Sequence, residues 1–526
     1  MQGKGVMANK YFLYATEFFA GMAVMAVELG ASRLMAPYFS SSQIVWTVII
    51  GTIMIAMALG NVIGGRMADK NADPSRLYFR LLIAAVWISA IPFAGKYIII
   101  GISLLLATFV SHNFLIWASF VTCFVIFVFP LVILGTVTPS LVKFTVKSLD
   151  NNGKTVGELG ALNTIGSIIG TFLPTFVTIP AIGTAATFEL FAGVLAVLGI
   201  VYFISVKKRL VACAVTVLLL LVFCILNLNY SFAFWEKDIL VEDESIYNYL
   251  LVKEDADSIS LSTNVLFGVQ SIMMKDRELT GMYYDYALAA PVMAGITEKE
   301  KGDILVLGMG TGTYAGLCEK YFPQSDIEGV EIDPKIARLA GEYFELPSQV
   351  SVSVYDGRAY LDQAGKYDVI MVDAYQDITI PFQLSTVEFF EKVKEHLNEG
   401  GVMVVNMNMR SDSEDSINDY LCDTIDSVFG NVYTVPVEGG SNCEVFATDR
   451  TDMMDQFATL SRELPQDNLQ NMMATVQEGC SLRNGGDLIL TDDKAPVELL
   501  GMKVLDEMIS QELAYYRGIY LKKWGL

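Results

Sequence analysis

Seven long apolar segments in the first 230 residues constrain the fold more than any other feature of the chain. A helix needs about 20 apolar residues to cross a bilayer, and segments of that length lie near 11–29, 43–65, 77–110, 113–136, 157–179, 183–204 and 210–228. The region 77–110 is longer than one span requires, so the pattern predicts seven spans, or eight if that region forms a hairpin. We therefore expect a polytopic α-helical membrane domain over residues 1–230, with about seven helices.

Three polar side chains fall inside or close to these segments, namely Glu17, Glu28 and Asn163. Polar groups at membrane depth are costly to place and are functional candidates by default. For Glu28 the alternative is that it only marks the end of the first helix. The first segment is not a cleavable signal, because no small-residue cleavage pattern follows it and further spans come at once.

Charge divides the chain into two parts. Residues 1–230 carry 14 Lys and Arg against 7 Asp and Glu, whereas residues 231–526 carry 22 against 51. Such an acidic second part argues against nucleic-acid binding, which needs a basic surface. The negative charge is compatible with a cationic substrate, which its field would concentrate, or with a surface that only keeps this part of the chain soluble. Seven scattered Cys without a CxxC pair, and only two His, argue against a metal site.

Basic clusters bear on the side of the membrane that the second part occupies. They lie at 4–10, 66–80, 143–154 and 207–209. With seven spans all four fall on one face, which the positive-inside rule makes cytoplasmic. The acidic domain then lies outside. An eighth span would place it inside but would move two basic clusters outside. We expect a multi-pass cell-membrane protein and favour the extracytoplasmic side for the domain.

The pattern changes after Trp235. Between 236 and 282, short alternating runs at 247–252, 258–262 and 269–274 predict a small antiparallel β unit. From 283 to 526 strands and helices alternate, which is typical of an α/β, Rossmann-like, doubly wound and mostly parallel sheet. We expect strands at 303–308, 326–331, 350–354, 368–373 and 401–407, and helices near 313–321, 334–344 and 386–397.

A glycine-rich turn follows the strand expected at 303–308. Gly308, Gly310 and Gly312 allow the backbone to approach a ligand closely, and Glu331 lies 19 residues beyond Gly312. A carboxylate at that spacing falls at the tip of the next parallel strand, where it can accept hydrogen bonds from the two hydroxyls of a ribose. The sequence therefore predicts a nucleoside site.

Further polar residues follow the ends of neighbouring strands: Asp333, the pair Asp356 and Gly357, and Asp373. Ligands of doubly wound sheets bind beyond the carboxyl ends of the strands. We therefore expect these side chains and the glycine turn to share one rim of the sheet.

On these residues, 240–410 resembles the spermidine synthase, or polyamine aminopropyltransferase, family, which has a methyltransferase-type Rossmann fold. The whole chain looks like a membrane-fused member of that family, because short sequence motifs at 28–33, 36–39, 163–167 and 491–498 are like those of such fused proteins. Separately, 60–70 resembles the loop between the second and third helices of major-facilitator transporters, which implies a cytoplasmic loop there.

The resemblance implies roles for individual residues. It implies that Gln270 contacts the nucleoside, that Glu331 binds the ribose and that Asp356 reads the adenine amino group. It makes Asp373 the catalytic aspartate and Tyr284 the tyrosine that holds the amine. Asp285, Tyr375, Gln376 and Asp377 are candidate substrate contacts, and Asp333 could also neutralise an ammonium group.

Three departures from the family pattern concern specificity. Thr311 stands where the turn normally carries an aspartate that binds the aminopropyl end of the donor. Tyr284-Asp285-Tyr286 replaces a tyrosine-histidine-glutamate run, and the second acid after Asp373 comes one residue late, at Asp377. These changes leave the choice of donor and of amine open.

The function expected from sequence is transfer of an aminopropyl group from decarboxylated S-adenosylmethionine to a di- or polyamine by a membrane-anchored enzyme without a metal. A homodimer is expected as well. One alternative is a methyltransferase that uses S-adenosylmethionine on a small or membrane-derived acceptor. A second is a polyamine or nucleoside transporter or sensor whose soluble domain only binds.

Overall fold

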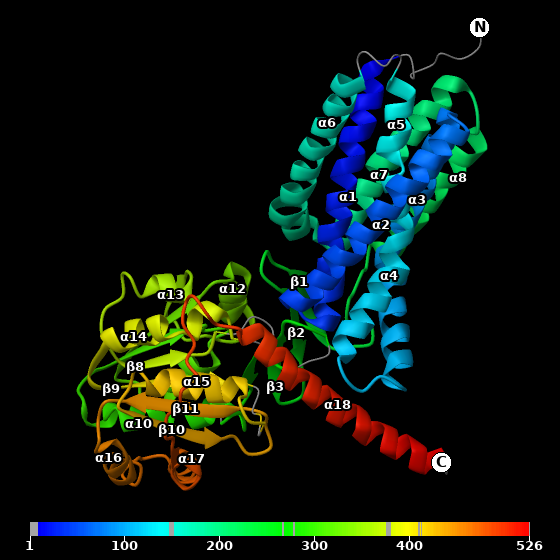
Figure 1. The fold of residues 1–526 in the computed structure, drawn as a ribbon. Helices are drawn as coiled ribbons and strands as arrows, with labels where there is room; N and C mark the ends of the chain where they lie inside the picture. Colours follow the sequence, from blue (N-terminus) through cyan, green and yellow to red (C-terminus); the bar gives the residue numbers. More distant parts are fainter. Residues whose placement is uncertain are drawn as a thin grey trace. The chain divides into compact units, whose positions relative to one another are not determined.

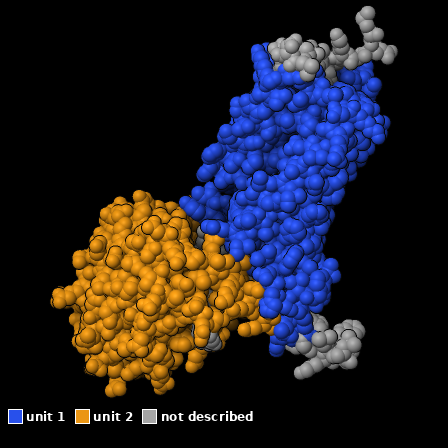
Figure 2. Space-filling model, in the orientation of Figure 1, with its two compact units in different colours: residues 1–236, 243–249, 513–526 blue, residues 237–242, 250–512 orange. Residues whose placement is uncertain are grey.

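The computed structural model describes residues 9–146, 152–265, 268–276, 279–374, 380–408, 411 and 413–524. The chain divides into two compact units (Figure 2). The first comprises residues 1–236, 243–249 and 513–526, and the second comprises 237–242 and 250–512. Residues predicted to contact substrate at 375–377 lie outside the described part of the chain.

The first unit is a bundle of helices (Figure 1). They are α1 (Lys10–Phe39), α2 (Gln43–Lys70), α3 (Pro74–Ala107), α4 (Phe114–Gly135), α5 (Val137–Thr145), α6 (Asn152–Leu173), α7 (Ile179–Val206) and α8 (Leu210–Asn227). Within the described residues, six helical stretches are long and apolar enough to cross a membrane. One of them, 152–206, has 55 residues and contains both α6 and α7. It is interrupted at Gly183, whose backbone is not helical (φ 80°).

Two predictions about this unit are corrected. α3 is one continuous helix from Pro74 to Ala107, so the hairpin that eight spans would need does not form within these residues. The segment 60–70, expected to be a loop, is the last part of α2, and the connection to α3 is only 71–73. Gly60 is needed for packing there, because a Cβ at this position would lie 2.5 Å from the carbonyl oxygen of Val132 on α4.

A polar cluster lies where α1, α5 and α6 meet. Glu17 is fully buried, and its Oε1 accepts hydrogen bonds from the Thr138 hydroxyl at 2.5 Å and from the Asn163 amide at 3.0 Å. α6 approaches α1 backbone to backbone, since a Cβ at Gly166 or Gly170 would lie 2.0 or 2.1 Å from a carbonyl oxygen of α1. Small residues on α6 therefore permit the contact that buries Glu17.

A small antiparallel sheet precedes the larger domain. Its strands, in the order β1-β2-β3-β4, are β1 (Ile239–Glu244), β2 (Tyr249–Glu254), β3 (Ser258–Ser262) and β4 (Ser271–Met274). β3 runs antiparallel to both β2 and β4. The alternating runs of the sequence predicted β2, β3 and β4, whereas β1 is additional.

The larger sheet has eight strands in the order β12-β10-β11-β9-β8-β5-β6-β7. They are β5 (Gly302–Leu307), β6 (Ser325–Glu331), β7 (Ser351–Val354), β8 (Tyr367–Val372), β9 (Leu397–Met407), β10 (Asn431–Pro436), β11 (Cys443–Thr448) and β12 (Ser481–Leu482). β5 to β9 pair in parallel, and β11 runs antiparallel to β9 and β10. The short β12 also runs antiparallel to β10. β5 with parallel neighbours on both sides, and the reversed β11 beyond β9, give the methyltransferase-type Rossmann arrangement.

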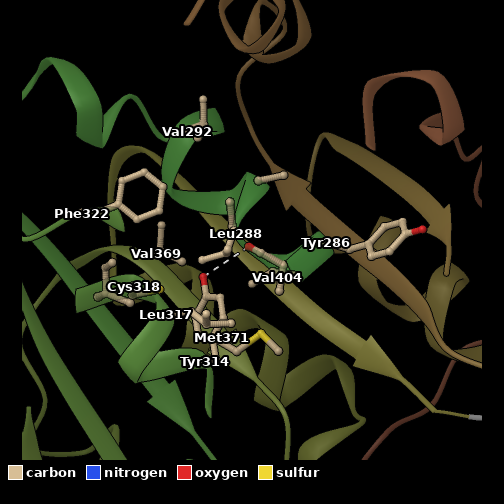
Figure 3. Packing of buried hydrophobic residues seen from close by; sticks show 14 of the residues in the cluster. Tyr286, Leu288, Val292, Tyr314, Leu317, Cys318, Phe322, Val369, Met371 and Val404 are labelled. Carbon is tan, nitrogen blue, oxygen red and sulfur yellow. Dashed lines mark hydrogen bonds between the residues drawn. The ribbon is translucent and has the colours of Figure 1, made fainter. Parts of the chain in front are cut away.

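Helices connect and cover these strands. They are α9 (Tyr283–Ala287), α10 (Ala289–Met293), α11 (Thr313–Tyr321), α12 (Pro334–Tyr343), α13 (Gly357–Tyr360), α14 (Val387–Glu395), α15 (Ile417–Asp426), α16 (Met453–Leu460) and α17 (Asp467–Gly479). α18 (Val497–Trp524) follows the last strand, and its residues from 513 onward belong to the first unit. Figure 3 shows side chains of α10 and α11, such as Val292 and Leu317, in one buried cluster with Val369, Met371 and Val404 of the sheet. This packing fixes the strand ends that carry the candidate site.

Candidate active site

The glycine turn joins β5 to α11. Gly308, Gly310 and Gly312 all have positive φ, at 82°, 59° and 88°. At Gly308 an added Cβ would lie 2.5 Å from Cα of Ala374, the residue after Asp373. Glycine is thus required at 308 both by the backbone angle and by the approach of the turn to the end of β8.

Glu331 ends β6 and connects two backbone segments. Its Oε2 accepts a hydrogen bond from the Gly310 N–H at 2.9 Å, and its Oε1 accepts one from the Asp333 N–H at 2.9 Å. Burial, together with the nearby charge of Asp333, raises the pKa of Glu331 to about 7, although the backbone hydrogen bonds that it accepts act in the opposite direction. The predicted ribose acid therefore lies against the glycine turn, as the spacing indicates.

Asp333 and Asp356 begin helices. Asp333 Oδ1 accepts from the Lys335 N–H and Asp356 Oδ1 from the Ala359 N–H, both at 2.9 Å. These bonds are N-caps of α12 and α13, the second of which begins at Gly357. Capping uses one oxygen of each carboxylate, and the nucleoside contacts predicted for both residues stay predictions.

Asp373 follows β8 and is held from two sides. Its Oδ1 accepts from the Asn406 amide of β9 at 2.8 Å, and its Oδ2 accepts from the Tyr283 hydroxyl of α9 at 2.7 Å. Burial raises the pKa of Asp373 to about 7, and the charge of Glu331 also raises it. A carboxyl group that titrates near neutrality suits a general base, because it can take a proton and release it again.

The two tyrosines that begin α9 differ from the expectation. The Tyr284 hydroxyl donates to the carbonyl oxygen of Gln270 at 2.7 Å, whereas the neighbouring Tyr283 bonds Asp373. Their rings lie 3.9 Å apart. Burial raises the pKa of both phenols, so they remain donors. Tyr283 was missed because the resemblance pointed to Tyr284 and both tyrosines are adjacent in sequence.

Strand β4 is bonded to the glycine turn by two hydroxyl groups. Ser271 Oγ accepts from the Thr311 N–H at 3.2 Å. Thr313 Oγ1 accepts from the Ile272 N–H at 3.1 Å and donates to the Ile272 carbonyl at 2.8 Å. Ser271 and Thr313 were not predicted, although each is adjacent to a predicted site residue, Gln270 or Gly312.

Asp285 has a different environment from the one expected of a substrate contact. Its Oδ1 accepts from both the N–H and the hydroxyl of Thr280 at 2.9 Å, and its Oδ2 accepts from the Gly281 N–H at 2.6 Å. Both oxygens are thus engaged in the turn that leads into α9. The structure gives Asp285 a role in shaping that turn.

A cavity of about 270 Å³ lies beside the turn. It is lined by residues of β4, by Thr311 to Thr313, and by 344–347. The acids Glu331, Asp356 and Asp373 do not line it. The hydrogen-bonded acids, which lie outside this cavity, are the candidates for the chemistry, since proton transfer needs a titratable group in contact with the reacting atoms.

Fold and site together define a class. A methyltransferase-type sheet that carries a glycine turn, an acid at the tip of the second strand and a further buried carboxyl after β8 is typical of enzymes that bind a nucleoside at the carboxyl ends of the strands. The comparisons with known proteins specify the family within that class.

Residues 286–438 match the model of the spermine/spermidine synthase domain. The chain is 50% identical over 338 residues to a probable polyamine aminopropyl transferase of Bifidobacterium longum, covering 61% of this chain and 75% of that protein. It is 30% identical over 251 residues to the polyamine aminopropyltransferase of Vibrio vulnificus, covering 46% and 81%. The solved structure of a probable spermidine synthase from Corynebacterium glutamicum is 24% identical, covering 48% and 98%, with a TM-score of 0.37.

The chain belongs to the polyamine aminopropyltransferase, or spermidine synthase, family and is a transferase. This confirms the family that the sequence motifs indicated.

Proposed function

We propose that this protein transfers the aminopropyl group of decarboxylated S-adenosylmethionine to a di- or polyamine. The observation that carries the proposal is Asp373, a buried carboxyl with a pKa of about 7, held by Tyr283 and Asn406 beside Glu331. Family membership supports it, because relatives of this chain are named polyamine aminopropyltransferases.

The chemistry needs a neutral amine nitrogen. That nitrogen attacks the methylene next to the sulfonium, the new C–N bond forms, and the C–S bond breaks with its electron pair passing to sulfur. Ionised Asp373 takes the proton that the nitrogen loses, a role that positioned bases perform for roughly 10²- to 10⁴-fold. Holding both substrates in line supplies most of the remaining rate enhancement.

Three residues are our candidates for binding the donor: Glu331 at the end of β6, Asp356 after β7 and Gln270 before β4. Glu331, fixed by the Gly310 and Asp333 amides, is our candidate for the ribose hydroxyls. Asp356 is the candidate for the adenine amino group. Gln270, whose backbone carbonyl accepts a hydrogen bond from the Tyr284 hydroxyl, is the candidate for a further contact to the nucleoside. Asp377, Tyr375 and Gln376 remain candidates for the amine side on sequence grounds alone.

A product assay tests the proposal. Purified protein is incubated with decarboxylated or intact S-adenosylmethionine and with a panel of di- and polyamines. We expect methylthioadenosine and a lengthened polyamine from the decarboxylated donor. S-adenosylhomocysteine from the intact donor would instead support the methyltransferase alternative, which Thr311 favours because its neutral side chain would not repel the donor carboxylate.

For the helical unit we propose that its long apolar helices span a membrane and anchor the enzyme. Seven spans, α1 to α4 and α6 to α8, would place the four basic clusters on the cytoplasmic face and the transferase domain outside. The decarboxylated donor is a cation made inside cells, so this topology would require passage of a substrate. Glu17 with Thr138 and Asn163 is the polar cluster of α1, α5 and α6 that could serve such passage.

A further inference from the structure

Glu444 on β11 is a buried acid that the mechanism above does not use. Its side chain is 0% exposed. Neither carboxyl oxygen has a hydrogen-bond partner among the residues that the structure describes. Burying a carboxyl group without partners is unfavourable, and the fold keeps this one inside the catalytic domain.

The register of the sheet places Glu444 next to the candidate active site. Glu444 is directly opposite Asn406 in the antiparallel β9–β11 pair, and directly opposite residues project on the same face with Cβ atoms about 5 Å apart. Asn406 donates to Asp373 Oδ1 at 2.8 Å. Its own Oδ1 accepts from the Asn442 amide at 2.8 Å.

Electrostatics agrees with this placement. Burial raises the pKa of Glu444 well above its usual value, and the charge of Asp373 raises it further. Glu444 in turn contributes to the raised pKa of Tyr314 on α11. The titratable groups that interact electrostatically with it are Asp373 after β8 and Tyr314 on α11, and neither carries a positive charge.

We propose that Glu444 binds a primary ammonium group of a substrate in the aminopropyl-transfer site. This inference rests on the proposed function and names a contact within it. Both substrates carry such a group: the amine keeps one ammonium while its other nitrogen attacks, and the donor ends in one. An ammonium offers three N–H donors, which would satisfy two carboxylate oxygens that the described residues leave unbonded.

Binding would release a proton. Burial favours the protonated form of Glu444 in the free site, and the incoming ammonium stabilises its carboxylate form, so that the carboxyl proton passes to solvent while the ammonium keeps its three protons. Asp373 has a different task, because it receives the proton of the attacking nitrogen. Two neighbouring acids thereby divide binding and proton transfer between them.

The test compares full-length wild type with Glu444→Gln and with a charge-matched control, Glu399→Gln, at an exposed position of β9. Titration calorimetry with 1,4-diaminobutane and with decarboxylated S-adenosylmethionine, each in two buffers of different ionisation enthalpy, gives affinity and proton release. We expect Glu444→Gln to lower the affinity for one of the two ligands about 10- to 100-fold, the range that corresponds to loss of a hydrogen bond to a charged group. It should release one proton fewer with that ligand.

The ligand whose affinity falls identifies the source of the ammonium. If the affinity for 1,4-diaminobutane falls, Glu444 binds the acceptor. If the affinity for decarboxylated S-adenosylmethionine falls while that for methylthioadenosine, which lacks the ammonium, is unchanged, Glu444 binds the donor. Unchanged affinity and proton release for both ligands would overturn the inference. So would a lower melting temperature with unchanged affinities, which would make Glu444 structural. If wild type and Glu399→Gln bind both ligands but form no product, the proposed function fails and the binding result stands by itself.

Discussion

The carboxyl of Asp373 carries the proposed chemistry, and a substitution at this residue tests it directly. Asp373→Asn keeps the shape of the side chain but removes its ability to accept a proton, so nucleoside affinity should change little while kcat falls by roughly 10² or more. Turnover is measured as methylthioadenosine formed, and affinity by calorimetry. Tyr283→Phe is the companion variant and should lower kcat less, because it removes only one hydrogen bond to Asp373. Activity of Asp373→Asn within a few-fold of wild type would exclude this residue as the base.

The same carboxyl should make stability depend on pH. The folded-state pKa of Asp373 and of Glu331 is raised to about 7, so folding favours their protonated forms. Their contribution is fully present below the unfolded pKa near 4 and is lost as pH rises through 7. We expect the melting temperature of the ligand-free protein to fall between pH 5 and pH 8, and to fall less in Asp373→Asn than in the exposed-site control Glu399→Gln. Equal slopes in both variants would contradict the prediction.

Which site residues the sequence could predict depends on how each is positioned. Gly308 and Glu331 were found because their spacing along one β-turn-α-β unit encodes their proximity. Asn406 was not found, because its contact with Asp373 depends on the pairing of β9 with β8. Glu444 was not found, because it lies near these residues only when β11 pairs antiparallel with β9, and no local pattern reveals that pairing. Tyr283 was missed for another reason: a choice between adjacent tyrosines depends on how α9 is rotated.

At the scale of elements, apolar runs predicted β5 to β9 within a few residues, since buried parallel strands are continuously apolar. β10, β11 and β12 were not assigned. They form the edge of the sheet and include polar positions such as Thr434 and Glu444, which break the apolar run. The continuous α3 could not be told from a hairpin by hydropathy alone, because length permits both.

Contact between α1 and α6 provides a prediction at this scale. Gly170→Ala adds a Cβ that would lie 2.1 Å from the Met22 carbonyl oxygen, so the helices must move apart and the protein should lose about 1 to 3 kcal/mol. Gly160→Ala is the matched control in the same helix, since its added Cβ has no atom within 4 Å. Thermal unfolding in detergent should show a lower melting temperature for Gly170→Ala only. A similar melting temperature for the two variants would mean that the close contact does not contribute to stability.

For the molecule as a whole, the side of the membrane that the transferase domain occupies can be tested by labelling. We expect a cysteine at Lys301→Cys to react with a membrane-impermeant reagent in intact cells, in a background where Cys224 and Cys480 are serine. Ala72→Cys, in the α2–α3 connection, should react only after the cells are opened. Protection of both until opening would place the domain in the cytoplasm and remove the need for substrate passage.

The hydroxyl contacts between β4 and the glycine turn have a consequence for how substrates come and go. Thr313 engages both the N–H and the carbonyl of Ile272, and these two bonds oppose separation of β4 from the turn. Gln270 precedes that strand and is carried with it. We expect these bonds to persist through the catalytic cycle, so that amide hydrogen exchange at Ile272 stays slow. A hinge at β4 that opened the donor site would break them and speed this exchange. We therefore expect substrates to enter and leave along other segments of the rim.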